Sequence, residues 1–278
     1  MPQPATADQS GEVLRPGCSV LLRDEDSVQV GLRPPLAVRL PRTHEVIALL
    51  RSLECGGAPP TPTAATTSAL RALRSAGLLV PAETTTSPAA RAQFGSTAAP
   101  RHHRRRRHHV AVRGSGAPED LLTPLLDDAG LTRDDRAPTV VLVVATGTLR
   151  RSELDPLLRD GLPHLVVAHG PEGHRLGPFV DPGRTACLRC VDAAESADDP
   201  RLPLLLEQAA GADGVPPPDP LLERIALGWA VRDLARWAEG DQPSTWSTTV
   251  DIGPTAPPVL TPRLRHPHCG CAWDTLLA

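Results

Sequence analysis

The stretch Val110-Ala-Val-Arg-Gly-Ser-Gly-Ala-Pro118 opens with apolar residues and runs into a glycine turn. The residues after it place leucines at helical spacing before Gly130: Leu121, Leu122, Leu125 and Leu126. Two valine-rich runs, 139–145 and 164–168, then lie on either side of another helical segment at 152–158. Alternating strands and helices are typical of a parallel sheet covered by helices, so residues 110–278 are predicted to form a Rossmann-like α/β domain.

The glycine turn is an incomplete nucleotide-binding motif. Gly114 and Gly116 match the start of G-x-G-x-x-G, but Glu119 takes the place of the third glycine. A phosphate needs free backbone N–H groups and positive potential at the helix start. Glu119 and Asp120 put carboxylates there, and we expect Pro124 to remove an N–H from the first turn. The sequence therefore predicts a degenerate nucleotide loop, and ATP is not expected as a cofactor.

Four cysteines form two closely spaced pairs. Cys187-Leu-Arg-Cys190 is a C-x-x-C, and Cys269-Gly-Cys271 is a C-x-C near the other end of the domain. Two such pairs provide four thiolates for one tetrahedral zinc ion, so we predict one structural zinc per chain that staples the C-terminal tail. Free thiols and a redox pair are the alternatives. The redox interpretation is disfavoured because neither pair is expected at the start of a helix after a strand.

The other polar residues of this domain give no catalytic motif. The sequence contains no G-x-S-x-G, H-E-x-x-H or P-loop. His169, His174, Asp181 and Arg184 are assigned to loops. The apolar segment 221–238 is expected to be a helix buried against the sheet or against another chain, which leaves a homodimer open.

The first 82 residues are predicted to form a small separate module. Short apolar runs at 20–23, 28–32 and 36–40 predict a three-stranded meander. Amphipathic helices are predicted at 44–53 and at about 67–76, and a last short strand at 78–80. This order suggests a winged-helix-like module over residues 1–82.

Residues 83–109 are predicted to link the two domains. They are rich in Pro, Ala and Thr and end in Arg101-His-His-Arg-Arg-Arg-Arg-His-His109. Such a basic run can bind nucleic acid, but beside a low-complexity linker it is more often a solvated segment, so no nucleic-acid partner is expected. The formal net charge of −3 agrees with this expectation.

Composition narrows the class of protein further. All 29 basic residues are Arg, which excludes any chemistry that needs a lysine ammonium. No apolar run approaches the length of a membrane span and the N-terminus lacks a signal-peptide pattern, so no membrane partner and a cytoplasmic location are expected.

Several segments together resemble a known family. They are Gly177-Pro-Phe-Val-Asp-Pro-Gly-Arg-Thr-Ala-Cys-Leu-Arg-Cys190, Asp199-Pro-Arg-Leu-Pro-Leu-Leu-Leu-Glu-Gln208, the helix with Trp229, and His266-Pro-His-Cys-Gly-Cys271. The chain resembles the ThiF-like partner proteins of YcaO-type cyclodehydratases, which are described as leader-peptide-binding proteins of thiazole/oxazole-modified microcin (TOMM) biosynthesis.

The resemblance implies a PqqD-like N-terminal module that binds the leader of a ribosomal precursor peptide as an added strand. Carried onto this chain, it implies a docking strand at Leu36, Ala37, Val38, Arg39 and Leu40, and a helix with Leu70 and Leu73. The second domain would be an adenylation-type fold without the lysine that active members use on ATP.

Three functions follow as hypotheses. The first is a non-catalytic adaptor that presents the precursor peptide to a separate YcaO-type cyclodehydratase for azoline formation. The second is an ATP-dependent adenylating enzyme, which Glu119 and Asp120 disfavour. The third is a winged-helix DNA-binding regulator that would use the Arg101–Arg107 tract.

Overall fold

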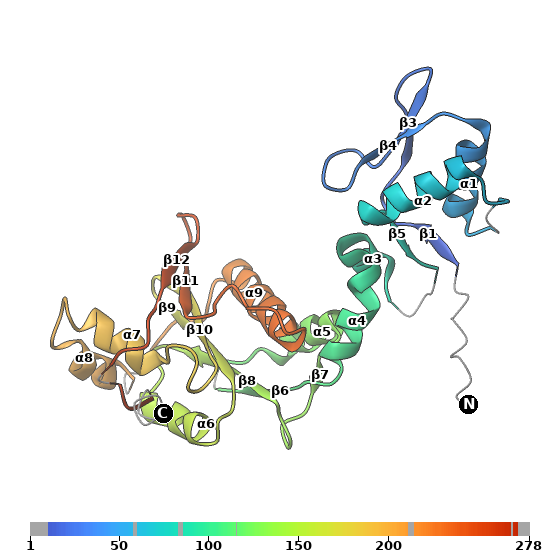
Figure 1. The fold of residues 1–278 in the computed structure, drawn as a ribbon. Coiled ribbons are helices and arrows are strands. Elements are labelled where there is room, and N and C mark those ends of the chain that lie inside the picture. The colour runs from blue at the N-terminus through green and yellow to red at the C-terminus, as the bar shows by residue number, and fades with distance from the viewer. Residues whose placement is uncertain are drawn as a thin grey trace. The chain divides into compact units, whose positions relative to one another are not determined.

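The chain forms two compact units, Met1–His103 and Arg104–Ala278, which are described one at a time. The computed structural model describes residues 11–57, 60–82, 86–114, 116–210, 214–267 and 269–271. Figure 1 shows the elements of each unit. In the described part of the chain, no helix combines the length and the apolar character that crossing a membrane requires.

The first unit contains the predicted meander. Strands β2 (Val20–Leu22), β3 (Ser27–Val30) and β4 (Val38–Pro41) pair antiparallel in that order, which confirms the prediction. Helices α1 (His44–Cys55) and α2 (Ala64–Ser75) pack on them. Strand β5 (Leu79–Pro81) pairs with β1 (Glu12–Leu14), a strand that the sequence analysis did not predict.

Capping residues explain where the two helices of this unit begin. The hydroxyl of Thr43 accepts a hydrogen bond from the N–H of Val46 at the start of α1. Thr63 and Thr66 form a reciprocal capping box at the start of α2. Because α2 begins at its threonine cap, it starts three residues earlier than the apolar pattern alone predicts.

The predicted linker is helical in its described part. It contains α3 (Pro88–Phe94), the 3-10 turn η1 (Gly95–Thr97) and α4 (Ala98–Arg105). Ser87 caps α3 and Pro88 occupies its first turn, an arrangement that favours helix initiation. Alanine and arginine are also good helix formers. A composition that suggested an irregular linker is therefore equally compatible with short helices.

The arginine tract is not wholly solvated either. In the second unit, Arg105 donates to the buried carboxylate of Glu239 at 2.6 Å and to the carbonyl of Ala129 at 2.9 Å. Arg104 donates to the carbonyl of Glu239. The expectation of a solvated run is wrong for Arg105, because its charge is neutralised inside the fold.

The second unit is built on a seven-stranded mixed sheet with the order β12-β11-β10-β9-β8-β6-β7. The strands are β6 (His109–Arg113), β7 (Thr132–Arg133), β8 (Val140–Thr146), β9 (His164–Gly170), β10 (Gly173–Val180), β11 (Thr248–Ile252) and β12 (Val259–Pro262). Strands β7, β6, β8 and β9 are parallel, and β10 to β12 are antiparallel. The parallel order predicted from the strands between residues 110 and 168 is therefore confirmed, and β10 to β12 extend this sheet with antiparallel strands.

Helices cover both faces of this sheet (Figure 1). One face carries α5 (Glu119–Ala129) and α9 (Pro220–Ala238), whose apolar side chains share a core with five strands. The opposite face carries η2 (Arg151–Leu154), α6 (Asp155–Arg159) and α7 (Leu188–Glu195). Helix α8 (Leu202–Ala209) follows α7. The arrangement has three layers, as predicted for an α/β domain.

Candidate functional site

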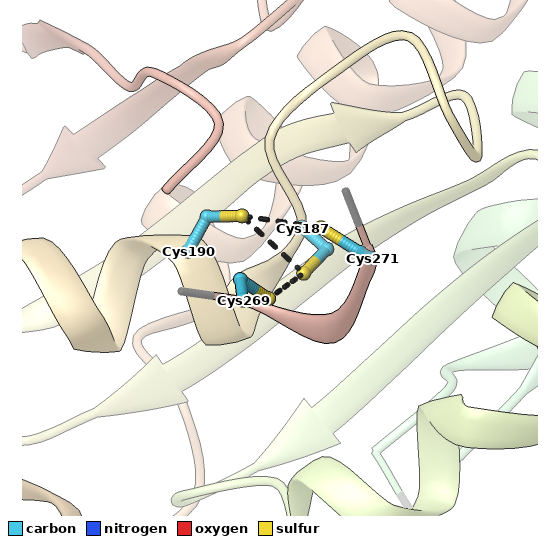
Figure 2. Close-up of side chains that lie close together, drawn as sticks. All are labelled: Cys187, Cys190, Cys269 and Cys271. Carbon is cyan, nitrogen blue, oxygen red and sulfur yellow. Dashed lines mark hydrogen bonds between the residues drawn. The ribbon is translucent and has the colours of Figure 1, made fainter. Parts of the chain in front are cut away.

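The four predicted metal ligands lie together in the second unit. The sulfur atoms of Cys187, Cys190, Cys269 and Cys271 are all within 4.8 Å of one another. Figure 2 shows the four side chains gathered at one point. The Sγ–Sγ distances are 3.3 Å for Cys190–Cys271, 3.5 Å for Cys187–Cys269 and 3.7 Å for Cys187–Cys190. Three of the cysteines are buried and Cys271 is half-buried. Two cysteine pairs that are 79 positions apart in the chain thus form one cluster.

Local backbone hydrogen bonds position the C-x-x-C pair and the C-x-C pair so that their sulfur atoms meet. Cys187 is the N-cap of α7, so Cys190 lies in the first helical turn with its N–H bonded to the carbonyl of Cys187 at 3.0 Å. On the tail, the N–H of Cys269 bonds to the carbonyl of His266 at 3.0 Å. Arg265 joins the two segments, since it donates to the carbonyls of Gly183 and Cys271 at 2.6 and 2.7 Å.

This placement corrects one step of the sequence analysis. The C-x-x-C pair does stand at the start of a helix, α7, where helix N–H groups favour a thiolate. The expectation that it does not was wrong because β10, the strand before α7, was read as a loop. The cluster of four still distinguishes this site from an isolated redox pair.

Hydrogen bonds among the thiols favour deprotonation of one of them. The Cys187 thiol donates to the sulfur of Cys190, which lowers the pKa of Cys190 and raises the pKa of Cys187. The backbone N–H of His266 stabilises the same Cys190 thiolate. Because a metal binds thiolates rather than thiols, the lowered pKa of Cys190 favours metal binding at this residue.

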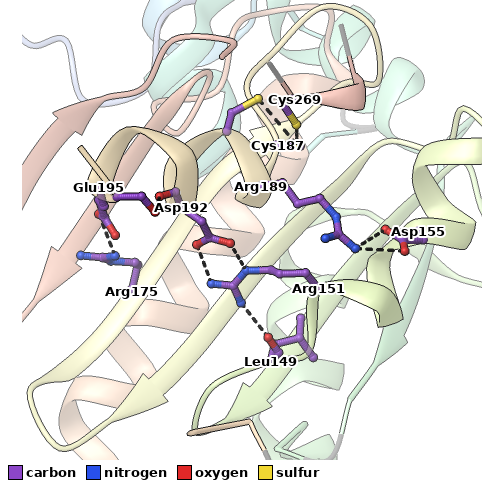
Figure 3. Close-up of polar contacts among 11 residues, drawn as sticks. Leu149, Arg151, Asp155, Arg175, Cys187, Arg189, Asp192, Glu195 and Cys269 are labelled. Atoms are coloured by element: carbon purple, nitrogen blue, oxygen red, sulfur yellow. Dashed lines mark hydrogen bonds and ion pairs between the residues drawn. The ribbon is translucent and has the colours of Figure 1, made fainter. Parts of the chain in front are cut away.

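Ion pairs fix α7 on its face of the sheet (Figure 3). Arg151 holds Asp192 of α7 with two hydrogen bonds of 2.7 and 2.9 Å, and both side chains are largely buried. Arg189 holds Asp155 of α6 with two bonds of 3.0 Å. Such bidentate contacts restrain α7 and with it the first cysteine pair.

The donor set fits a tetrahedral metal ion. Four thiolates about 2.3 Å from one zinc ion lie roughly 3.8 Å from one another. The three measured Sγ–Sγ distances, 3.3 to 3.7 Å, are close to that value. The four cysteines could therefore bind a metal such as zinc.

The degenerate nucleotide loop lies at the carboxyl ends of β6 and β8. In open α/β sheets this edge is where ligands bind, at the point where the strand order reverses. Gly114 has φ +112°, and a Cβ there would lie 2.0 Å from the carbonyl oxygen of Val144. A Cβ on Gly116 would lie 2.6 Å from Oγ1 of Thr146. Both glycines are thus required by the close approach of β6 and β8, whether or not a phosphate binds.

Residues 214–219, which we call the strap, close this crevice. The space between the strand ends, the strap and α9 is about 10 Å³, too small for more than a water molecule. His169 Nε2 donates to the carbonyl of Pro216 at 3.0 Å. Val215 approaches so closely that its Cγ2 is 3.0 Å from where a Cβ on Gly147 would be. The strap therefore leaves no room for a larger molecule between these elements.

The charges at the helix start are as predicted, with one correction. Glu119 and Asp120 lie in the first turn of α5, and Glu119 forms an ion pair with Arg133. This ion pair lowers the pKa of Glu119, so its carboxylate stays charged. Pro124 lies inside α5, beyond the first turn, so it does not remove an N–H from a phosphate site as expected.

The histidines assigned to loops are strand residues. His169 is the last but one residue of β9 and His174 is in β10, and their rings are 5.0 Å apart beside the crevice. Burial lowers the pKa of His174. The glycines and the proline in β10 concealed the strand, and burial alternates along it only from Gly173 to Leu176.

The residues predicted to bind a peptide divide into two groups. Leu40 and Leu73 are core residues of the first unit. Leu36, Val38 and Leu70 are half-buried on the surface of that core, and Arg39 is exposed and paired with Asp24. Ala37 is half-buried and, like Leu36, precedes β4 rather than belonging to it.

The mixed sheet and its helical layers form a Rossmann-like α/β fold. The heterocyclase TruD has a similar structure, with a TM-score of 0.72 and 18% identity over 95% of this chain and 43% of TruD. A heterocyclase in complex with substrate and cofactor matches with a TM-score of 0.71 and 17% identity, over 94% of this chain and 39% of the other. Escherichia coli MccB with MccA matches with a TM-score of 0.60 and 11% identity, over 94% of this chain and 99% of MccB.

These likenesses confirm, at the level of fold, the resemblance inferred from the sequence. The chain spans about two fifths of the length of the heterocyclases it matches and nearly the whole of MccB. No protein-family model matches the sequence, and no curated protein is similar to it.

Proposed function

We propose that the protein is a non-catalytic adaptor that binds the leader of a ribosomal precursor peptide and presents it to a YcaO-type cyclodehydratase. The observation that carries this proposal is the closed crevice at the carboxyl ends of β6 and β8, where the strap leaves space for no more than a water molecule. An adaptor needs the fold but not the nucleotide. Its contribution to the rate would be the effective concentration of the bound peptide.

The leader would add as a strand to β4 in a PqqD-like module. Strand β4 is at one end of the β2-β3-β4 sheet, so its outer edge has no strand partner among the described residues. Half-buried apolar side chains flank that edge, namely Leu36, Val38 and Leu70. Backbone hydrogen bonds would give affinity, and these side chains would select apolar residues of the leader. Arg39 is exposed beside them.

Zinc is the metal that we propose for the cysteine cluster, at one ion per chain. Four thiolates leave no open coordination position, so the ion would hold the tail on α7 and take no part in a reaction. ATP is not part of the proposed function of this chain. The exposed residues Leu221 and Ile225 at the start of α9 suit a contact between two copies, which would give a homodimer.

Binding of the leader is tested with fluorescein-labelled peptides made from short reading frames next to the gene. We expect Leu70→Glu to weaken binding by at least about tenfold, or about 1.4 kcal/mol, because the charge would be placed against the apolar side chains of the leader. The matched control is Leu22→Glu on β2, the other edge of the same sheet, where Leu22 is 67% exposed. Equal loss in both variants, with unchanged circular dichroism, would contradict docking at β4.

An adenylating enzyme is the second candidate. It is favoured by the full-length match to MccB, a protein that has also been solved with ATP. The decisive measurement is ATP–pyrophosphate exchange with and without the peptide. Exchange above background would establish the enzyme. The adaptor would be established if the precursor peptide lost water only after a YcaO-type protein was added.

A further inference from the structure

Among the described residues, one side of the cysteine cluster borders a cavity. A cavity of about 770 Å³ borders it, and its lining includes Cys269 and Cys271 from the tail together with Arg189 of α7. Cys187 and Cys190 are 2% and 0% exposed and are not in this lining. A small solute that enters the cavity therefore meets the tail sulfurs before the sulfurs of α7.

The sulfur distances favour pairs that join the two segments. Cys190–Cys271 at 3.3 Å and Cys187–Cys269 at 3.5 Å each connect α7 or its N-cap to the tail. The pair within the C-x-x-C, Cys187–Cys190, is the longest of the three at 3.7 Å. Each tail cysteine thus has its nearest measured partner on the other segment.

From this arrangement we propose that hydroperoxides convert the cluster into two disulfides, Cys190–Cys271 and Cys187–Cys269, so that a covalent clasp replaces the metal clasp. The inference rests on the metal site of the proposed function. Oxidation would leave the tail attached to α7, which is the opposite of a switch that releases it.

The chemistry balances with peroxide as the oxidant. The Cys271 thiolate attacks one peroxide oxygen, the O–O bond breaks, and the products are a sulfenic acid and hydroxide. The Cys190 thiolate then attacks the Cys271 sulfur, the S–S bond forms, and a second hydroxide leaves. Two protons convert these hydroxides into water, so each disulfide consumes one hydrogen peroxide. Cys269 and Cys187 react in the same way, and the metal ion leaves as its thiolate ligands are consumed.

The test is disulfide mapping on the full chain after its zinc content has been measured. The protein receives two hydrogen peroxide molecules per chain, a chromogenic chelator records zinc release, and iodoacetamide blocks the remaining thiols. Trypsin cleaves after Arg189, so Cys187 and Cys190 leave in separate peptides, and cleavage after Arg265 gives a tail peptide with Cys269 and Cys271. Cys18 and Cys55 serve as reference thiols that should be alkylated.

We expect the tail peptide to be joined to peptides 185–189 and 190–201, with fragmentation assigning Cys190 to Cys271. Two single variants check the pairing, because Cys269→Ser should leave only Cys190–Cys271 and Cys271→Ser only Cys187–Cys269. Peptides 185–189 and 190–201 joined to each other, with an alkylated tail, would overturn the proposal while leaving the zinc site intact. If the protein never contained zinc but formed these disulfides between α7 and the tail, the proposed metal site would be wrong and the proposed pairing would stand.

Discussion

The second unit has two places that the sequence analysis singled out for ligand binding, and they differ in what surrounds them. At the carboxyl ends of β6 and β8 the glycine turn persists, but the strap fills the crevice and carboxylates surround the helix start. At the start of α7 the four sulfurs are converging and bordered by an open cavity. A motif that serves backbone packing and a motif that supplies donor atoms look alike in a sequence. Geometry separates them.

The largest effect is expected at the cysteine cluster. Cys269→Ser should reduce zinc from one ion per chain to none and destabilise the second unit by about 4 kcal/mol, because loss of a metal site is among the most costly single changes. For 150–250 residues this corresponds to a fall in Tm of roughly 8–16 °C, measured by calorimetry.

The control for this variant is Cys55→Ser, which changes an exposed cysteine of the first unit. Its free energy of unfolding should change by less than about 0.5 kcal/mol. A Cys269→Ser protein with unchanged Tm would mean that the cluster contributes nothing to stability, and the contrast between the two places would disappear.

A smaller loss is expected at the glycine turn. Gly114→Ala should cost about 3 kcal/mol without any nucleotide present, because its Cβ would clash with the carbonyl of Val144 and its φ of +112° is unfavourable for alanine. The matched control is Gly161→Ala, which also has positive φ but meets nothing within 4 Å, and should cost about 1 kcal/mol. Urea unfolding gives both values. Equal costs would remove the packing explanation for Gly114.

The sequence predicted the elements whose signal is periodic and local. The meander, α1, β8, β9 and the cysteine set follow from apolar spacing, from valine runs and from C-x-x-C and C-x-C spacing. What it missed depends on distant partners. Strand β1 exists through its pairing with β5, and β10 contains glycine and proline but is held between β9 and β11. Closure of the crevice also depends on the strap, which lies about 100 residues from the glycine turn it covers.

A pH dependence should distinguish the crevice from the rest of the unit. Burial lowers the pKa of His174 from its ordinary 6.5, with His169 adding to the effect and Asp219 opposing it. Above pH 6.5 the imidazole is neutral in both states and its contribution to stability is complete. As the pH falls, the unfolded chain binds the proton first, so stability is lost towards the lower pKa of the folded state.

The expected slope from this one group is at most about 1.4 kcal/mol per pH unit. It is measured as the difference in the free energy of unfolding between pH 7.5 and 5.5. His174→Gln should reduce the loss, and His44→Gln, at an exposed position on α1, should not. His164 remains in both variants, and since burial lowers its pKa as well, part of the slope should persist. If the free energy of unfolding changed equally with pH in the unmodified protein and both variants, His174 would not contribute to this pH dependence.

The smallest expected change is the most informative about why no nucleotide is expected to bind. His169→Ala removes the ring that donates to the carbonyl of Pro216 and enlarges the crevice. If space alone excludes ATP, calorimetry on this variant should detect binding. We expect none at millimolar ATP, because the chain has no lysine and Glu119 and Asp120 oppose phosphate at the start of α5. Adding Glu119→Gln to the same variant then tests charge separately from space. Binding in the double variant alone would show that charge is the decisive barrier, whereas binding in His169→Ala would show that space alone excludes ATP.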